Sequence, residues 1–233
     1  MRTLVLGDLH GNYKGLKQCF ERAQFDYEKD MLISLGDVVD GYPQVRECVD
    51  ELLKIKNFML IIGNHDKWFL EWATMDREIS WRTQGGQATF NSYVPKEHID
   101  FFKNAYACHV DDKNRLFVHG GIDPNQTDIE KQKLDVLMWD RRLIQTARKK
   151  EYRNSKTKLG GFEEIIVGHT STTYTCDSTE PQKFCNVWML DTGGGWEGKL
   201  TLMDVDTKEY WQSDMATDLY PGHMPRPIII EGN

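Results

Sequence analysis

Five short polar clusters in this sequence carry the residue types that bind metal ions in proteins. The clusters are Asp8-Leu9-His10, Asp37 with Asp40, Asn64-His65-Asp66, His119 and His169. In an extended segment, residues two apart project to the same face, so Asp8 and His10 can point at one position. The two oxygens of a carboxylate allow Asp37 to bridge two cations. Imidazole with carboxylate or carboxamide oxygen suits Mn, Fe or Zn, whereas structural zinc favours clustered thiolates.

The seven histidines of the chain fall into two groups. A single histidine after a strand is usually a core or surface residue, so no cluster is strong evidence by itself. Four of the histidines, however, follow an apolar run and lie beside a glycine or one residue from it. Glycine at such positions permits tight turns and close approach of the backbone to a ligand. The other three lack this context, and we expect them to be structural or solvated: His98, His109 and His223.

Short buried strands are expected to position these clusters. Apolar runs predict strands at 3–6, 31–35, 58–62, 115–118 and 164–167, and apolar periodicity predicts helices over 12–24 and 45–55. Asn12 is the expected N-cap of the first helix. Alternation of strands and helices indicates βαβ units with a parallel sheet, whose ligands bind beyond the carboxyl ends of the strands.

The second half of the chain is richer in predicted strands. Segments 187–190, 199–205 and 209–212 look like a three-stranded meander, while 65–105 and 128–158 look helical. No repeat or linker interrupts the chain. We therefore expect an α/β protein with a single domain over residues 1–233, built from two packed mixed β-sheets flanked by helices.

Composition places the chain among globular proteins, with 39% hydrophobic and 28% charged residues. No apolar run approaches the roughly 18 residues that cross a bilayer, so we expect no membrane contact. The apolar run at 4–6 is shorter than the core of a signal peptide, which predicts a cytoplasmic protein. The five cysteines form no CxxC pair, and a disulfide framework is not expected. A bridge between Cys176 and Cys185 is the one pairing that a hairpin there would allow.

Charge is distributed unevenly along the chain. The net charge of −7 argues against a protein that coats nucleic acid. Residues 141–158 nevertheless hold eight Lys or Arg and one acid, a balance of +7 that leaves −14 on the rest. This basic segment is either a solvated helix face or a functional positive surface.

The order of the motifs resembles that of the calcineurin-like metallophosphoesterases. The matching segments are GDLHG at 7–11, GDVVDG at 36–41, GNHD at 63–66, VHGG at 118–121 and VGHT at 167–170. WRTQGGQATFNSY at 81–93 and MWDRR at 138–142 are similar to segments of the bacterial and phage branch of the phosphoprotein (serine/threonine) phosphatases. That branch is related to the symmetrical dinucleoside polyphosphate hydrolases. The resemblance covers about residues 3–205.

The resemblance implies an α/β/β/α sandwich that holds two divalent metal ions, with Mn²⁺ favoured over Fe or Zn. It assigns the first ion to Asp8, His10 and Asp37, and the second to Asp37, Asn64, His119 and His169. In this family pattern His65 protonates the leaving oxygen, Asp40 orients His65, and Arg141 grips the phosphate.

Two positions depart from the family pattern. The second motif usually continues GDxxDR, with an arginine that contacts phosphate, but this chain has Gly41 there. The third motif has Asp66 where the phosphoprotein phosphatases commonly have glutamate. Arg142 and Lys67 are candidates to replace the missing positive charge. These departures affect the expected choice of substrate more than the metal site.

Four functions are compatible with these motifs. The first is a phosphomonoesterase that acts on phosphoserine or phosphothreonine, with a phosphorylated protein or a small phosphoester as substrate. The second is a dinucleoside polyphosphate hydrolase, and the third is a phosphodiesterase that acts on nucleic-acid ends. The fourth, a scaffold with a vestigial site, is disfavoured because all six expected ligands, together with His65 and Asp40, are present.

Overall fold

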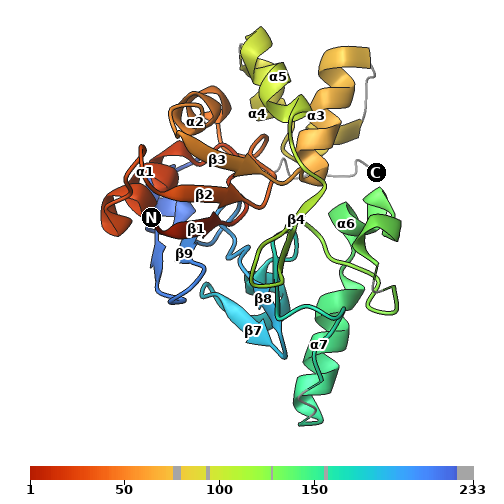
Figure 1. Ribbon diagram of the computed structural model, residues 1–233. Helices are drawn as coiled ribbons and strands as arrows, with labels where there is room; N and C mark the ends of the chain where they lie inside the picture. The colour runs from red at the N-terminus through yellow and green to blue at the C-terminus, as the bar shows by residue number, and fades with distance from the viewer. Residues whose placement is uncertain (76–79, 93–94, 127, 155–156, 225–233) are drawn as a thin grey trace, which may run out of the picture.

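The computed structural model describes residues 1–75, 80–92, 95–126, 128–154 and 157–224. Its strands form two five-stranded sheets (Figure 1). The first sheet has the order β10-β9-β1-β2-β3, and the second has the order β4-β5-β6-β8-β7. Both sheets mix parallel and antiparallel pairs, which confirms the predicted fold class.

The strands of the first sheet are β1 (Thr3–Leu6), β2 (Met31–Ser34), β3 (Asn57–Leu60), β9 (Thr201–Asp204) and β10 (Tyr210–Gln212). β1, β2 and β3 are parallel neighbours, and β9 runs antiparallel to β1. The strands of the second sheet are β4 (Cys108–Val110), β5 (Arg115–Val118), β6 (Glu164–Val167), β7 (Gln182–Phe184) and β8 (Val187–Met189). Here β5, β6 and β8 are parallel.

Alternation of side chains along the strands explains the layering. Val5 and Ile33 of the first sheet join Phe117 and Ile166 of the second in one buried cluster between the sheets. Their neighbours along each strand point to the opposite face, because successive residues of a strand alternate. Leu4 and the other residues of the first sheet that point away from the second sheet therefore pack against the helices on that outer face. Each sheet is thus covered by helices on one face and by the other sheet on its second face.

The helices of the first half are α1 (Tyr13–Ala23), α2 (Val45–Leu52), α3 (Asn64–Met75), α4 (Gln87–Asn91) and α5 (Lys96–Lys103), with a 3₁₀ turn η1 (Ser80–Gln84). Those of the second half are η2 (Ile129–Lys131), α6 (Leu134–Trp139), α7 (Arg142–Tyr152), α8 (Thr172–Cys176) and α9 (Ala216–Leu219). The Asn12 side chain accepts a hydrogen bond from Gly15 N at 2.9 Å, which confirms it as the N-cap of α1. The predicted helical segments 65–105 and 128–158 contain helices, although each segment consists of several short ones.

The predicted meander is wrong. β8 belongs to the second sheet, whereas β9 and β10 belong to the first. Residues 191–200 cross from one sheet to the other, and an alternating apolar pattern carries no information about which sheet a strand joins. The sequence did not predict β4 and β7, because each has only three residues and so short a strand gives no recognisable apolar run. None of the five cysteines, Cys176 and Cys185 included, forms a disulfide. Within the described ranges, no helix is long and apolar enough to cross a membrane.

Candidate active site

The polar clusters predicted from the sequence meet where the two sheets pack together. Each cluster follows the carboxyl end of a parallel strand: β1, β2 and β3 in the first sheet, β5 and β6 in the second. Their side chains are all buried: Asp8, His10, Asp37, Asp40, Asn64, His65, His119 and His169. The structure therefore brings together eight residues that lie as far as 161 positions apart in the chain.

Asp37 lies at the centre of two groups of potential metal ligands. One group is His10, Asp37 and His65, the other is Asp37, His119 and His169, and the ligand atoms of each group lie within 4.8 Å of one another. Oδ2 of Asp37 is 3.6 Å from Nε2 of His10 and 3.3 Å from Nε2 of His119. A single carboxylate oxygen thus faces imidazole nitrogens from both sheets.

Asn64 and Asp8 complete the two groups from either side. Oδ1 of Asn64 is 3.0 Å from Nε2 of His119, so the carboxamide joins the second group. The Asp8 carboxylate accepts the backbone N–H of His169 at 3.0 Å. Asp8 lies outside both close groups, but it is buried in the same region, as is Asp191. Burial, with the negative charge of Asp191, raises the pKa of Asp8 well above its usual value. Burial, with the negative charge of Asp37, raises the pKa of Asp191 to about 6.

The histidine nitrogens have the hydrogen-bond pattern of metal ligands. Nδ1 of His10 donates to Val39 O at 3.0 Å, and Nδ1 of His119 donates to Leu35 O at 2.7 Å. Each ring therefore turns its Nε2 toward Asp37. Nε2 of His169 is a buried polar atom with no hydrogen-bond partner among the described residues. Burial, with the positive charges of His119 and Arg141, lowers the pKa of His169 to about 2 and keeps its ring neutral.

These observations fit divalent cations at this position. A buried, neutral imidazole nitrogen without a partner is costly unless a ligand accepts its lone pair. Three buried carboxylates close together, those of Asp8, Asp37 and Asp191, also favour bound positive charge. The donors are nitrogen and oxygen atoms with no thiolate, which suits Mn, Fe or Zn. Burial opposes the charged form of His119, yet the charge of Asp37 raises its pKa to about 10, a sign of the strong negative potential at the centre.

His65 and Asp40 form a hydrogen-bonded pair beside this centre. Nδ1 of His65 lies 2.6 Å from Oδ2 of Asp40. The Asp40 carboxylate also accepts hydrogen bonds from Trp81 Nε1 at 2.7 Å and Thr89 Oγ1 at 2.6 Å. Burial opposes protonation of His65, but Asp37 and Asp40 raise its pKa. Because Nδ1 is engaged by Asp40, only Nε2 of His65 faces the centre.

Comparison with known proteins agrees with this arrangement. Residues 1–193 match the family model of the calcineurin-like phosphoesterases. The chain belongs to this family. It is a hydrolase of phosphoesters.

Two curated relatives align over nearly their whole length. Serine/threonine-protein phosphatase 1 of Salmonella typhimurium is 26% identical, over 86% of this chain and 90% of that protein. The symmetrical bis(5'-nucleosyl)-tetraphosphatase of Pseudomonas fluorescens is also 26% identical, over 94% of this chain and 96% of that protein. A crystal structure provisionally assigned to a diadenosine tetraphosphatase has the same fold, with a TM-score of 0.68, 17% identity, and coverage of 91% of this chain and 92% of that one.

Backbone strain in this phosphoesterase is concentrated at the site. Four of the ten non-glycine residues with positive φ in the described ranges are site residues: His10, Asp37, Asp40 and His169. Such conformations cost roughly 1–3 kcal/mol each and persist only where surrounding contacts impose them. Those contacts are visible around Asp37, whose carbonyl oxygen accepts the N–H groups of Leu9 at 3.1 Å and His10 at 2.8 Å.

Asp66 supplies a second set of these contacts. Its carboxylate accepts N–H groups from Asp37 at 2.7 Å, Val38 at 2.8 Å and Gly63 at 3.0 Å. The sequence showed Asp66 only as a departure from the family pattern. In the structure it joins the loop after β2 to the loop after β3. Its role is therefore to fix the bridging carboxylate and the start of α3.

Arg141 lies at the rim of the site, immediately before α7. Its Nη1 donates to His169 O at 3.2 Å and to Thr170 Oγ1 at 3.3 Å. Arg142 pairs with Asp140 at 2.5 Å, and Lys67 lies 3.6 Å from Asp135. Both candidates for replacing the missing arginine are therefore engaged by carboxylates.

Gly41 itself leaves little room for a side chain. Its φ is +73°, and an added Cβ would lie 3.0 Å from Cβ of His10. A longer residue would be strained by its backbone conformation and would press on His10.

Several residues around the site were not predicted. Asp191 follows β8 and precedes three glycines, the same pattern as the recognised motifs, but the expected meander concealed it. Tryptophans form the walls: Trp196 lies 4.7 Å from the ring of His10, Trp68 lies 4.9 Å from His65, and Trp139 lies 5.6 Å from His169. Nothing in the local sequence distinguishes these tryptophans from core residues.

Proposed function

We propose that this chain is a metal-dependent phosphomonoesterase that removes phosphate from phosphoserine or phosphothreonine in proteins. The observation that carries the proposal is the position of Asp37 between two groups of imidazole donors, beside the His65–Asp40 pair. The donor chemistry favours Mn²⁺, with Fe or Zn as alternatives. The proposed ligands are Asp8, His10 and Asp37 for one ion and Asp37, Asn64, His119 and His169 for the other.

The chain's own residues prepare this site for phosphoryl transfer. Two bound divalent cations would supply charge neutralisation and a reactive water. Asp37 holds the two ligand groups together through its single carboxylate, and Asp66 fixes Asp37 by binding its N–H. Phosphoryl transfer depends mainly on positioning and electrostatics, so this rigidity contributes directly to the rate.

His65 is the proposed general acid. Burial opposes protonation of His65, but the charges of Asp37 and Asp40 raise its pKa and so favour the protonated ring. With Nδ1 donating to Asp40 Oδ2, the proton on Nε2 is the one available to a departing alkoxide. The histidine also lies close enough to His10 and Asp37 to form a candidate ligand group with them. Pairing with Asp40 fits either role, so the metal content of a His65→Asn variant decides between them.

Arg141 is the proposed phosphate clamp. Its guanidinium lies at the opening of the site and is fixed on one side by His169 O and Thr170 Oγ1. Arginine presents a planar fork of N–H donors that matches two phosphate oxygens. With Gly41 at the position of the family arginine, Arg141 is the principal side-chain donor for the substrate.

A second candidate function has its own support. The relative from Pseudomonas fluorescens, named a symmetrical bis(5'-nucleosyl)-tetraphosphatase, aligns with 94% of this chain. The relative from Salmonella, named a serine/threonine-protein phosphatase, aligns with 86%. A phosphodiesterase acting on nucleic-acid ends stays a prediction without further support.

A direct comparison of substrates tests the proposal. The protein is assayed with Mn²⁺ on a phosphoserine peptide, on diadenosine tetraphosphate and on an oligonucleotide without terminal phosphates, whose hydrolysis would require cleavage of a phosphodiester. We expect kcat/KM to be highest for the phosphopeptide. Faster turnover of diadenosine tetraphosphate would make the second function correct.

A further inference from the structure

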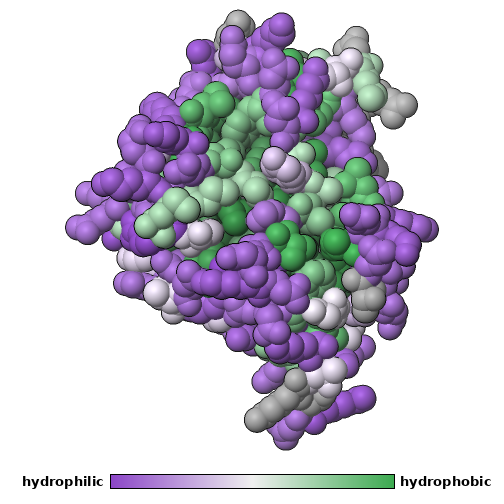
Figure 2. All heavy atoms as spheres, viewed as in Figure 1, coloured by the Kyte–Doolittle hydropathy of each residue, from purple (hydrophilic) through white to green (hydrophobic). Residues whose placement is uncertain are grey.

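Helix α7 carries the basic segment outward from the candidate site. It begins directly after Arg141, and its buried face, formed by Leu143, Ile144 and Ala147, packs on the second sheet. Figure 1 shows α7 projecting from the body of the molecule. Figure 2 shows that this end of the molecule is mostly hydrophilic. The outer face of α7 is thus a surface that leads away from the site.

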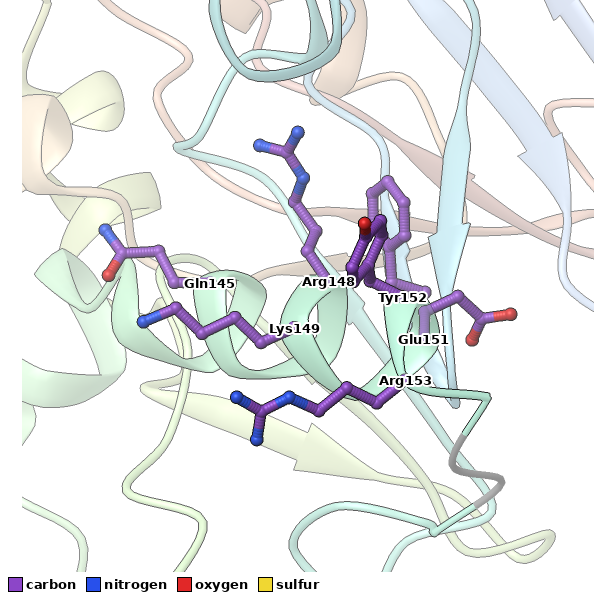
Figure 3. Close-up of a pocket in the computed structure, with 7 residues that line it drawn as sticks. Gln145, Arg148, Lys149, Glu151, Tyr152 and Arg153 are labelled. Atoms are coloured by element: carbon purple, nitrogen blue, oxygen red, sulfur yellow. The ribbon is translucent and has the colours of Figure 1, made fainter.

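Four residues form one row along this outer face. Arg141, Gln145, Lys149 and Arg153 are spaced four apart, and residues four apart are neighbours on a helix. With a rise of about 1.5 Å per residue, the row is about 18 Å long. Figure 3 shows the side chains of Lys149 and Arg153 extending back along the helix toward its beginning. The row therefore directs its positive charge toward the site.

The row borders a cavity of about 720 Å³ beside α7. Arg148, Tyr152 and Phe184 line the other side, and Tyr152 is 91% exposed. The guanidinium of Arg148 lies 5.6 Å from the ring of Phe184. Glu151 is the only carboxylate in the lining, and it accepts the backbone N–H of Cys185 at 2.8 Å. The hollow is therefore positively charged, with aromatic rings at its far end.

The basic residues toward the end of α7 differ from most other Lys and Arg residues of the protein in their ion pairing. Within the ranges that the structure describes, no carboxylate forms an ion pair with Arg148, Lys149, Lys150 or Arg153. Basic residues elsewhere, such as Arg115 and Lys208, are paired with acids at 2.6 Å or less. A chain with net charge −7 thus keeps four cations without acidic partners on one helix that starts at the site. Such a surface is complementary to an anionic partner.

We propose that the row on α7 binds an acidic segment of the phosphorylated protein substrate, which rests on the proposed phosphatase function. Lys149 lies about 12 Å along the helix from Arg141, and Arg153 about 18 Å. An extended peptide covers about 3.3 Å per residue, so these positions face residues about four and six from the phosphorylated one. Alternate side chains of an extended peptide are about 6.6 Å apart, close to the spacing of the row. The net acidity of the chain favours a peptide over a nucleic acid.

The test compares two double variants with the same change in charge. Lys149→Gln/Arg153→Gln removes the row, and Lys96→Gln/Lys103→Gln removes two lysines from α5 as a control. Each is assayed on a phosphoserine peptide with Asp at positions four and six on one side, on the same peptide with Asn there, and on 4-nitrophenyl phosphate. Peptides with the acids on the N-terminal and on the C-terminal side are both used.

We expect the α7 variant to lose about five-fold in kcat/KM on one acidic peptide at low salt, mainly through KM. The loss should vanish at high salt, because exposed charges are screened. The Asn peptide, 4-nitrophenyl phosphate and the control variant should show no change. If the α7 variant matches the control on both acidic peptides, the row does not bind substrate.

Fluorescence anisotropy with a labelled, unphosphorylated acidic peptide separates this proposal from the proposed function. Weaker binding by the α7 variant than by the control supports the row even if phosphopeptides are not hydrolysed. Equal binding by both variants overturns it. Binding of a single-stranded oligonucleotide that the α7 substitutions weaken, without any effect on the peptide, also overturns it in favour of a nucleic-acid surface.

Discussion

The two sheets build their halves of the site in different ways. On the first sheet, Asp37 and Asp40 are held by dense hydrogen bonds: Asp66 ties the loops after β2 and β3 together, while Trp81 and Thr89 fix Asp40. On the second sheet, His169 has its N–H bound to Asp8, but its Nε2 has no partner among the described residues. In the first half, protein groups hold the site residues in place. In the second half, Nε2 of His169 needs a partner that the described residues do not provide.

This difference indicates which site residues are held in position by the protein and which by bound metal. Residues of the first half should keep their positions without metal, because buried N–H groups and carboxylates satisfy one another there. In the second half, the ring of His119 is held by Leu35 O, but the ring of His169 should depend on metal for its stabilising contact. Asp37 belongs to both halves, since its carboxylate faces His10 on one side and His119 on the other. Changes at Asp37 should therefore have the largest effect.

Asp37→Asn should reduce kcat/KM by about 10⁴-fold, because a carboxamide offers one good ligand oxygen and no charge between the two groups. Elemental analysis should show metal loss in the variant. Chelator should remove wild-type activity, and Mn²⁺ should restore it in the wild type alone. Asp30→Asn, at another buried carboxylate that pairs with Arg2 at 2.5 Å, is the control and should keep full activity. Full turnover by metal-free protein would contradict the two-metal hypothesis.

His65→Asn should lower kcat by about 10³-fold while the metal content stays unchanged, because the substitution removes a proton donor and not a ligand. The loss should be smaller for 4-nitrophenyl phosphate than for phosphoserine, since a nitrophenolate leaves without protonation. The measurement is kcat on both substrates together with metal content.

His98→Asn provides the matched control for His65. His98 is also buried and lies 2.8 Å from a carboxylate, Asp50, but it is outside the site. It should leave kcat unchanged on both substrates. Metal loss in the His65 variant would make His65 a ligand, as its closeness to His10 and Asp37 allows.

Arg141→Ala should lower kcat/KM by about 10²-fold on every substrate, because a donor that holds the transferring oxygens acts in the transition state. Arg141→Lys should recover little, since an ammonium group lacks the planar fork. Arg142→Ala is the control: its guanidinium pairs with Asp140 and should not affect turnover. Equal losses in the two alanine variants would mean that the segment is structural.

Most of the first half could be predicted from the sequence, because its motifs follow parallel strands that end at one edge. Geometry there depends on local order: a strand is followed by a ligand that lies beside a glycine or one residue from it. The same rule placed His119 and His169 in the second half, although it could not tell which sheet they join. Asp191 obeyed the rule and was missed, since β8 was assigned to a meander with strands of the other sheet.

Local sequence patterns could not predict the residues that act through contacts with distant parts of the chain. Asp66 appeared as a departure from a motif, and only the folded chain shows that it accepts four N–H groups from two loops. The same holds for Thr89 and Trp81, which reach Asp40 from 49 and 41 residues away. Their partners are set by how the segment 80–92 folds back over the loop after β2, and periodicity within a window cannot reveal that.

The smallest expected effects are on stability, and they separate the two halves most directly. Asp66→Ala leaves four buried N–H groups without an acceptor, so it should lower the free energy of unfolding by about 3 kcal/mol, with or without Mn²⁺. His169→Ala removes a nitrogen that has no partner within the described structure. It should change stability less in chelator but should remove the share of the Mn²⁺ stabilisation that the second ion gives the wild type. That stabilisation is about 2.7 kcal/mol at a hundred times the dissociation constant.

Chemical unfolding of wild type and both variants, in chelator and in Mn²⁺, measures this difference. The two-half comparison requires that Asp66→Ala shift both curves by the same amount while His169→Ala narrows the gap between them. Asp66→Asn retains one acceptor oxygen and should recover part of the loss, which separates hydrogen bonding from cavity formation. If Mn²⁺ still stabilises the His169 variant as much as the wild type, then His169 is not a ligand, and its unpartnered nitrogen marks strain in the second sheet instead.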